Sequence, residues 1–408
     1  MYNLHLSPEQ LEIRDTVRAF VTREIRPVVL KADRLDVRDR TLPMHLLGEA
    51  SRLGLRTLAL SEDNGGIGAD ALTSCIVAEE LAAGDADIAA ILAETSRISH
   101  LIFDRVMSQA ERDRLMPKFL ADDRAQLAFA DREAETDTRL GVNYHRAAAP
   151  ASVILASATQ AGNGDWVIAA RKSGVANAPI ACLFAVTVKI AGRAGDSVLL
   201  VPADAPGVIV TAHDKPWPHG TCGEVTFADC RVPAGNLLGE NAATLLRAAD
   251  GRSVPLAQAI NLGIGRAAYE AAVDYARLRI QGGRPLIEHQ AIATKLADIA
   301  IRLEVARAAV WQAAWAADHP EAVADRSLSD LPLTTVAQVF VSDAIVKATK
   351  DAAEIFGAMG VMRDMPLQKY LHDARVCQHV GDGNREARLR IAEHIAGFRR
   401  GAAAMAAE

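Results

Sequence analysis

The sequence has few aromatic residues, 4% of the total, and no uncharged apolar run that approaches the roughly 20 residues of a membrane span. We therefore expect no membrane segment. Cysteine is also scarce: the five residues are far apart and none forms a CxxC pair, as the positions Cys75, Cys182, Cys222, Cys230 and Cys377 show. Such a set predicts neither a disulfide framework nor a metal site, and it favours reduced thiols in a cytoplasmic protein.

Positive charge is not in excess, because the formal net charge is −6 at pH 7. This gives no electrostatic reason to expect nucleic acid as a partner. A signal peptide is not indicated either, since residues 1–4 lead directly into a polar helix start. The glycine-rich stretch 61–68 lacks the GxGxxG spacing and the flanking strand of a dinucleotide-binding loop, so we interpret it as a turn.

Hydrophobic residues make up half of the chain, and alanine is abundant, which suits closely packed helices. A chain of 408 residues is long enough for two or three domains. Near the N-terminus, Ser7, Pro8 and Gln10 form a capping-box helix start, and apolar residues follow at helical spacing. Further helices are predicted over residues 43–53, 71–83, 89–103 and 109–119.

The pattern changes to short strands near residue 125. Strand candidates cover residues 151–156, 166–169, 181–186, 197–201 and 224–227. Residues 162–165, Gly-Asn-Gly-Asp, predict a hairpin turn between the first two. Pro233 ends the strand pattern. This region therefore predicts a small antiparallel β domain.

The helical pattern returns near residue 240 and continues. Four long periodic segments with short links predict a helix bundle, over residues 256–278, 287–317, 333–356 and 384–399. The predicted fold class is α+β. It comprises an N-terminal all-α domain over residues 1–122, a middle antiparallel β domain over residues 123–238 and a C-terminal four-helix bundle over residues 239–408.

Residues 379–384, His-Val-Gly-Asp-Gly-Asn, lie between two helical segments. Glycines on both sides of Asp382 let the backbone take positive φ and leave little side chain between the backbone and a ligand. We predict that the rest of the chain holds a cofactor against this loop.

Three stretches resemble motifs of the acyl-CoA dehydrogenase superfamily. Residues 279–292 are similar to its R-x-x-F-G-x-x-I-x-x-x-Q-A-I segment, with Gly282 in place of the phenylalanine. Residues 355–360 resemble its I-F-G-G-x-G, and residues 230–239 resemble the V-x-V-P-x-x-N-x-L-G that leaves the β domain. Each match is weak alone, but three in the right order and spacing identify the fold, and the resemblance covers nearly the whole chain.

The resemblance implies FAD bound between the β domain and the bundle, with a neighbouring subunit completing the site. It implies an acyl-CoA substrate, electron-transfer flavoprotein or another acceptor, and a homodimer, homotetramer or hetero-oligomer with a homologous chain. Arg279 would bind the FAD pyrophosphate of the neighbouring subunit, because its fork of donors suits phosphate. Gln281 and Gln290 would hydrogen-bond nearby, and Gly357 and Gly360 would let the backbone approach the cofactor.

The catalytic base departs from the superfamily pattern. Members carry a glutamate that takes the α-proton of the acyl-CoA while a hydride leaves the β-carbon. Aligned through residues 373–375, that position falls on Gly381, which has no side chain to accept a proton. The position on the first bundle helix that some members use instead is Ser253. Asp382 is one residue further, and nitroalkane-oxidising flavin relatives use an aspartate in this loop. Asp382 is thus a candidate base, with a plain turn residue as the alternative.

The flavin-side motifs depart as well. The superfamily's T-E-P-x-A-G-S-D corresponds to residues 130–137. Thr136 keeps a hydroxyl for the pyrophosphate, whereas Ala130 cannot act as the threonine that bonds the flavin ring. Residues 174–177 lack the tryptophan of W-I-S/T-N. Glu354 replaces a FAD-contacting glutamine, and a carboxylate near phosphate is unfavourable.

His379 precedes the loop, and its imidazole could act as an acid or base near pH 7. No catalytic partner is near it in sequence, so we interpret it as a packing residue.

Two main hypotheses follow from these matches and departures. The first is an FAD-dependent oxidoreductase that acts on an acyl-CoA thioester with a non-standard or absent base; oxygenation or flavin-assisted elimination on the same fold are variants of it. The second is a non-catalytic subunit of a heterotetramer. It rests on an asymmetry, because the chain keeps the residues that act across the interface and loses those that act on its own flavin.

Overall fold

The computed structural model describes residues 5–36, 39–133, 155–213, 219–248, 250–379 and 383–396. Its internal contacts divide the chain into two compact units. Unit 1 comprises Met1–Leu46, Asp70–Ala90 and Gly251–Ala392, and unit 2 comprises Leu47–Ala69, Ile91–Asp250 and Glu393–Glu408. The division into three domains stays a prediction.

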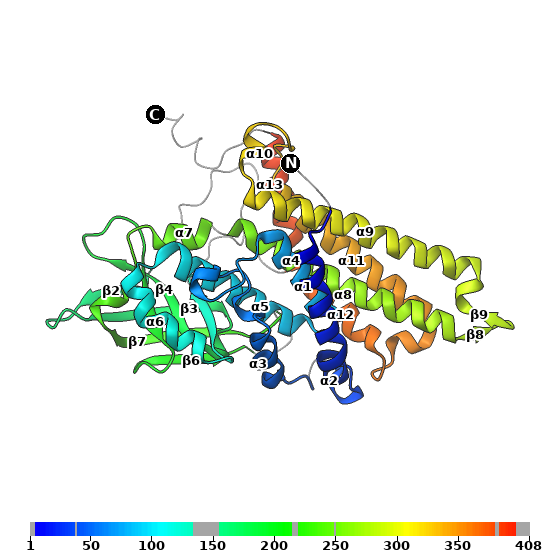
Figure 1. Ribbon diagram of the computed structural model, residues 1–408, viewed down its shortest axis with the longest axis horizontal. Coiled ribbons are helices and arrows are strands. Elements are labelled where there is room, and N and C mark those ends of the chain that lie inside the picture. Colours follow the sequence, from blue (N-terminus) through cyan, green and yellow to red (C-terminus); the bar gives the residue numbers. More distant parts are fainter. Residues whose placement is uncertain are drawn as a thin grey trace. The chain divides into compact units, whose positions relative to one another are not determined.

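Unit 1 is helical. Its helices are α1 (Pro8–Phe20), α2 (Arg26–Val29), α4 (Ala71–Ala82), α8 (Asp250–Leu278), α9 (Gln290–Asp318), α10 (Glu321–Ala324), α11 (Leu333–Ile355), α12 (Pro366–Cys377) and α13 (Gly383–Ile395). The long helices α8, α9 and α11 lie side by side, and the short hairpin of β8 (Ile280–Gln281) and β9 (Arg284–Pro285) joins α8 to α9 at one end (Figure 1). The predicted bundle is therefore present.

Local signals explain where these helices begin and which side they bury. Ser7 accepts a hydrogen bond from the Gln10 amide, while the Gln10 side chain accepts one from the Ser7 amide, which is the predicted capping box. Helix α9 buries a stripe at helical spacing that contains Leu296, Ile299, Leu303, Ala306 and Val310. Its opposite side is left to solvent and to charged residues.

Helix α4 is buried along its whole length, which includes two glutamates. Glu80 accepts hydrogen bonds from Arg266 at 2.6 and 2.7 Å and from Arg18 at 2.7 and 3.1 Å. Arg307 makes the corresponding pair of bonds with Glu79, at 2.8 and 3.2 Å. Burial alone would raise the pKa of Glu80, but the two arginines hold it below its usual range.

Unit 2 contains the sheet. Its strands are β1 (Gln126–Ala130), β2 (Ser157–Gln160), β3 (Trp166–Ala176), β4 (Ala181–Ile190), β5 (Ser197–Pro202), β6 (Val208–Ala212) and β7 (Cys222–Val232). The order is β1-β4-β2-β3-β7-β6, and β5 pairs with β4. Helices α6 (Gln109–Ala121) and α7 (Ala242–Ala248) also belong to unit 2. Helices α3 (Met44–Arg52) and α5 (Ala86–Ser99) have residues in both units, as does α13 with its last three residues.

The sheet differs from the prediction in its pairing. The expected fold class is confirmed, but the sheet is mixed: β1 and β2 pair with β4 in parallel, while the other pairs are antiparallel. The predicted strand over residues 151–156 is wrong at its described end, because Leu155 and Ala156 are not in a strand and β2 starts at Ser157. Residues 151–154 lie outside the described part of the chain. The hairpin predicted at residues 162–165 joins β2 to β3, with Gly164 at φ +89°.

Within the described ranges, no helix is long and apolar enough to cross a membrane. In the same ranges, no group of three or more His, Cys, Asp and Glu side chains is placed to hold a metal ion.

Candidate cofactor site

The hairpin end of unit 1 gathers the predicted phosphate-binding residues. The two strands of the hairpin pair Gln281 with Arg284, and the Leu286 amide donates to the Arg279 carbonyl at 2.8 Å. The two turn residues, Gly282 and Gly283, have φ of +60° and +81°. A two-residue turn of this kind needs positive φ at both central positions, so glycine is favoured where the superfamily motif has phenylalanine.

Arg279, Gln281 and Gln290 are brought together at this end. All three are exposed. The backbone carbonyl of Gln281 is 2.9 Å from Nε2 of His289, which is the N-cap of α9, so the hairpin is tied to the helix that begins with Gln290. Arg284 lies opposite Gln281 in the same hairpin and adds a second guanidinium that the sequence analysis did not single out.

The side chains of Arg279, Gln281 and Gln290 make no hydrogen bond or ion pair with other residues in the part of the chain that the structure describes. One guanidinium and two amides are thus left with open donors on a single end of the bundle. A diphosphate needs cationic and neutral N–H donors of this kind. The residues present therefore fit the pyrophosphate part of a dinucleotide.

The two glycines predicted at the site have different roles. Gly357 has φ +59°, and a Cβ there would meet no atom within 4 Å, so its backbone is open to an approaching group. Gly360 is buried, and a Cβ there would lie 2.2 Å from the Ala353 carbonyl oxygen. Glycine at residue 360 is thus explained by the chain's own packing. Beside it, Tyr275 stacks on Phe356 with ring centroids 4.1 Å apart.

The other predicted site residues lie outside the described part of the chain. These are Thr136, Gly381 and Asp382. His379 is described: it is exposed, and its amide donates to the Val376 carbonyl at 3.1 Å in the turn that follows α12. The structure therefore places the turn that precedes the loop but not the candidate base.

The flavin-side motif begins on β1. Ala130 is fully buried there and pairs with Val186 of β4, so no hydroxyl is present at this point of the sheet. Gly174 has φ +60° within β3, and Asn177 has φ 61°. The Asn177 side chain donates to Thr95 Oγ1 at 3.1 Å and to the Leu127 carbonyl at 3.3 Å, which gives it a structural role inside unit 2.

Ion pairs between residues far apart in the sequence hold the residues just after β1. Lys172, with a fully buried side chain, lies 2.7 Å from Glu133. Burial lowers the pKa of Lys172, and Glu133 opposes that effect. Arg247 of α7 binds Asp131 at 2.5 Å and Asp196 at 2.6 Å. These pairs could not be predicted from the sequence, because the partners lie far apart along the chain and charged residues of these types are common.

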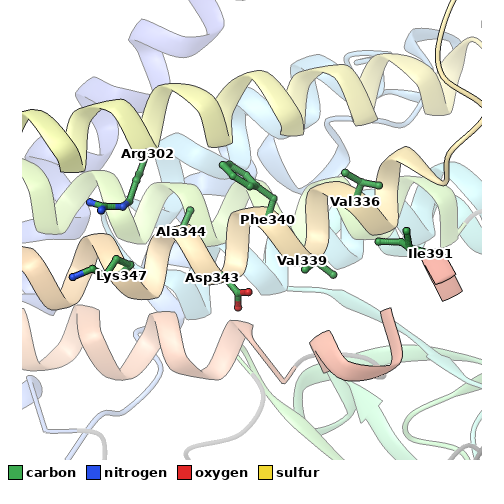
Figure 2. A pocket seen from close by; sticks show the side chains of 8 residues that line it. All are labelled: Arg302, Val336, Val339, Phe340, Asp343, Ala344, Lys347 and Ile391. Atoms are coloured by element: carbon green, nitrogen blue, oxygen red, sulfur yellow. The ribbon is translucent and has the colours of Figure 1, made fainter. Parts of the chain in front are cut away.

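A separate apolar groove lies on the bundle surface, between α9, α11 and α13. It has a volume of about 510 Å³. Figure 2 shows Phe340 and Val336 of α11 and Ile391 of α13 along it, with Arg302 reaching in from α9. Its other lining residues are Val339, Asp343, Ala344 and Lys347. The charged members are engaged elsewhere as well: Arg302 and Lys347 lie 3.2 and 2.6 Å from Asp351.

Comparison with known proteins matches both ends of the chain to family models. Residues 7–123 match the model described as acyl-CoA dehydrogenase, N-terminal domain, and residues 252–396 match acyl-CoA dehydrogenase, C-terminal domain. The chain is 30% identical over 405 residues to an acyl-CoA dehydrogenase of Bacillus subtilis, covering 97% of this chain and 100% of that one.

Two further relatives agree with this match. Over 390 residues the chain is 28% identical to the human mitochondrial short-chain specific acyl-CoA dehydrogenase, covering 93% of this chain and 88% of that one. Among solved structures, butyryl-CoA dehydrogenase from Megasphaera elsdenii superposes with a TM-score of 0.79 at 25% identity, covering 97% of this chain and 100% of that one.

Proposed function

Because the chain belongs to the acyl-CoA dehydrogenase family, a family of FAD-dependent oxidoreductases, we propose that it oxidises an acyl-CoA thioester without the usual glutamate base. The observation that carries the proposal is the set of open donors on the hairpin end of unit 1. None of the three side chains, those of Arg279, Gln281 and Gln290, donates a hydrogen bond to another described residue. The hairpin turn and the contact of His289 with the Gln281 carbonyl hold the backbone in place. Exposed N–H donors that no described protein group engages are available to an anionic ligand there.

Arg279 would hold the pyrophosphate of FAD, with Gln281 and Gln290 bonding beside it. Bound FAD would supply the hydride acceptor, at N5 of its flavin ring. The chain's own task is then to remove the α-proton of the thioester, so that the β-hydride can leave and a carbon–carbon double bond can form. Gly381 cannot take that proton, and we assign the role to the neighbouring carboxylate of Asp382.

The groove of Figure 2 supports a proposed subunit contact. Phe340, which lines the groove, is 42% exposed, and Ile301 and Val305 on α9 are 60% and 49% exposed. An apolar face of this kind on a single chain favours association. We propose that it contacts a second copy or a homologous chain, and that electrons leave the assembly to electron-transfer flavoprotein or another acceptor. Phe340→Asp should lower the mass measured in solution.

A second candidate function is supported by the same residues. The chain keeps the donors on its bundle, whereas Ala130 is buried in the sheet without a hydroxyl and Gly381 lacks a carboxylate. A subunit that lends Arg279 to a partner's flavin while holding none itself would show this asymmetry. In that case the protein is part of a hetero-oligomer with a catalytic homologue.

The visible spectrum and the mass in solution of the protein purified alone test both functions. About one FAD per chain supports the first, and Asp382→Asn should then abolish flavin reduction by acyl-CoA while the spectrum of bound FAD stays unchanged. Asp364→Asn is the matched control, because it removes an exposed carboxylate from a turn ahead of α12. Reduction that survives in the Asp382 variant would refute the base assignment. Flavin that appears only on co-expression with a homologous chain, at about half an FAD per chain, would establish the second function instead.

A further inference from the structure

Among the residues that the matched motifs place near FAD on the bundle, Glu354 carries a negative charge, which is unfavourable beside phosphate. It lies in the last turn of α11, one residue before the helix ends, and its side chain is 45% exposed. The matched motif places it where a glutamine would contact FAD, and a carboxylate there would repel a diphosphate. Without a compensating positive charge nearby, glutamate in place of this glutamine would weaken cofactor binding.

The structure shows that this carboxylate is not left alone. Lys295, in the second turn of α9, places Nζ 2.5 Å from Oε2 of Glu354, and Lys350 lies 3.9 Å from the other oxygen. The hydrogen bond from Lys295 is the main reason why the pKa of Glu354 is held below its usual range. The glutamate is therefore ionised, and Lys295 compensates its charge across the interface between α9 and α11, which we call the α9–α11 seam.

Lys295 lies near the start of the helix that begins with Gln290. It is five residues after Gln290 on the same helix, a rise of about 7 Å along the axis. The seam continues with Arg302 and Lys347 on Asp351, so the lysine–glutamate pair is the part of the seam nearest the hairpin end. The pair thus joins the helix that begins with Gln290 to the helix that leads into Gly357.

We propose that Lys295 and Glu354 act together as a replacement for the missing glutamine in cofactor binding. Lys295 cancels the charge that would repel the diphosphate, and Glu354 holds the lysine at the end of the bundle. Neither residue is catalytic, since neither is assigned to the reacting atoms. This inference rests on the proposed function, because it presumes that FAD is bound at this end of the bundle.

The test is a titration of the apo-protein with FAD at low and at high salt. Binding is measured by the quenching of flavin fluorescence. Lys295→Met should bind FAD about 3- to 10-fold more weakly at low salt, the range expected for one or two unit charges several ångströms away in a high dielectric. The loss should shrink at 0.5 M salt, where charges are screened. Glu354→Gln should bind FAD at least as tightly as the wild type, and the double variant should return to within about twofold of it.

Arg14→Met is the control, because it also removes one positive charge from a partly exposed pair, with Asp15 on α1, and Arg14 belongs neither to the hairpin nor to the groove. Its FAD affinity should equal that of the wild type. The inference is overturned if Lys295→Met matches the wild type at low salt, if its loss is independent of salt, or if Glu354→Gln weakens binding. A wild-type protein that binds no FAD at all would overturn the proposed function as well, and that result differs from equal binding by wild type and variant.

Discussion

Replacing Lys172 by methionine should destabilise unit 2 more than any single change at its surface. The Lys172 ammonium is completely buried and lies 2.7 Å from Glu133, which is 3% exposed. It also donates to Thr187 Oγ1 at 3.1 Å and to the Asp131 carbonyl at 3.3 Å. Methionine keeps the length of the side chain but removes the charge and all three donors.

The magnitude follows from what is left behind. Glu133 would keep hydrogen bonds from the amides of Leu155 and Ala156, at 2.7 and 3.2 Å, but would lose the ammonium that lies 2.7 Å from it. Removing one partner of a buried ion pair costs about 3–5 kcal/mol. For a unit of about 150–250 residues this corresponds to a fall in Tm of about 6–20 °C.

Differential scanning calorimetry of the wild type and three variants measures the effect. Lys172→Met should give the full loss, and adding Glu133→Gln should restore part of it, because the buried negative charge is removed while the amide oxygen still accepts from one of the two backbone amides, Leu155 or Ala156. The control is Arg171→Met on the same strand, whose pair with Glu224 at 3.0 Å is 61% and 36% exposed. An exposed pair contributes at most about 1 kcal/mol.

Two results would refute the reasoning. One is a Lys172→Met variant whose Tm lies within the small range expected for Arg171→Met. The other is a double variant as unstable as Lys172→Met alone, because the cost would then come from lost packing of the lysine and not from the carboxylate that has lost the lysine ammonium. If Lys172→Met does not fold, Glu133→Gln in the wild-type background probes the same pair from its other side.

Three further outcomes are expected. Gly263→Ala should destabilise unit 1 by at least about 1–3 kcal/mol in thermal unfolding, because the added Cβ would lie 2.3 Å from the Glu79 carbonyl oxygen. Burial alone would raise the pKa of Asp104, yet hydrogen bonds led by that of Asn64 hold it below its usual range. A depressed pKa gives stability that is present above the unfolded value near about 3.9 and lost as the pH falls through the folded one, so Asp104→Asn should lower Tm at pH 7 but progressively less below about pH 4. Burial raises the pKa of the Cys75 thiol, so a thiol reagent at pH 8 should modify Cys75 only after unfolding.

Features set by neighbouring residues could be predicted from the sequence. The capping box of Ser7 and Gln10, the stop of the second helix before Gly54, which has φ +80°, and the turn at Gly164 all involve residues within four positions of one another. In each of these the residue type dictates the local backbone. The turn between α8 and α9 is local in the same way, because its adjacent residues Gly282 and Gly283 both have positive φ, whereas the cofactor-binding roles of Arg279, Gln281 and Gln290 stay a prediction.

The parallel pairing of β1 with β4 could not be predicted in this way. The two strands are separated by β2 and β3 in the chain, and Gln126 pairs with Ala181. A short apolar run such as residues 181–186 has the same composition whether its neighbour runs parallel or antiparallel. Its direction depends on a partner strand that starts 55 residues earlier in the chain, at Gln126, and that is a property of the whole unit.

The ion pairs could not be predicted from the sequence either, and they bear most directly on function. Lys172 and Glu133 are 39 residues apart, and Lys295 and Glu354 are 59 apart. Seen in sequence, Glu354 counts against cofactor binding; seen beside Lys295, it does not. Binding FAD draws on many such contacts, so it tolerates a substitution that a neighbour offsets. Proton abstraction depends on one carboxylate at one position. Gly381 has no side chain, so no neighbouring residue can restore a base at that position. Under the proposed function the two capacities can therefore be separated in one chain, with the predicted cofactor donors retained where the superfamily's base is absent.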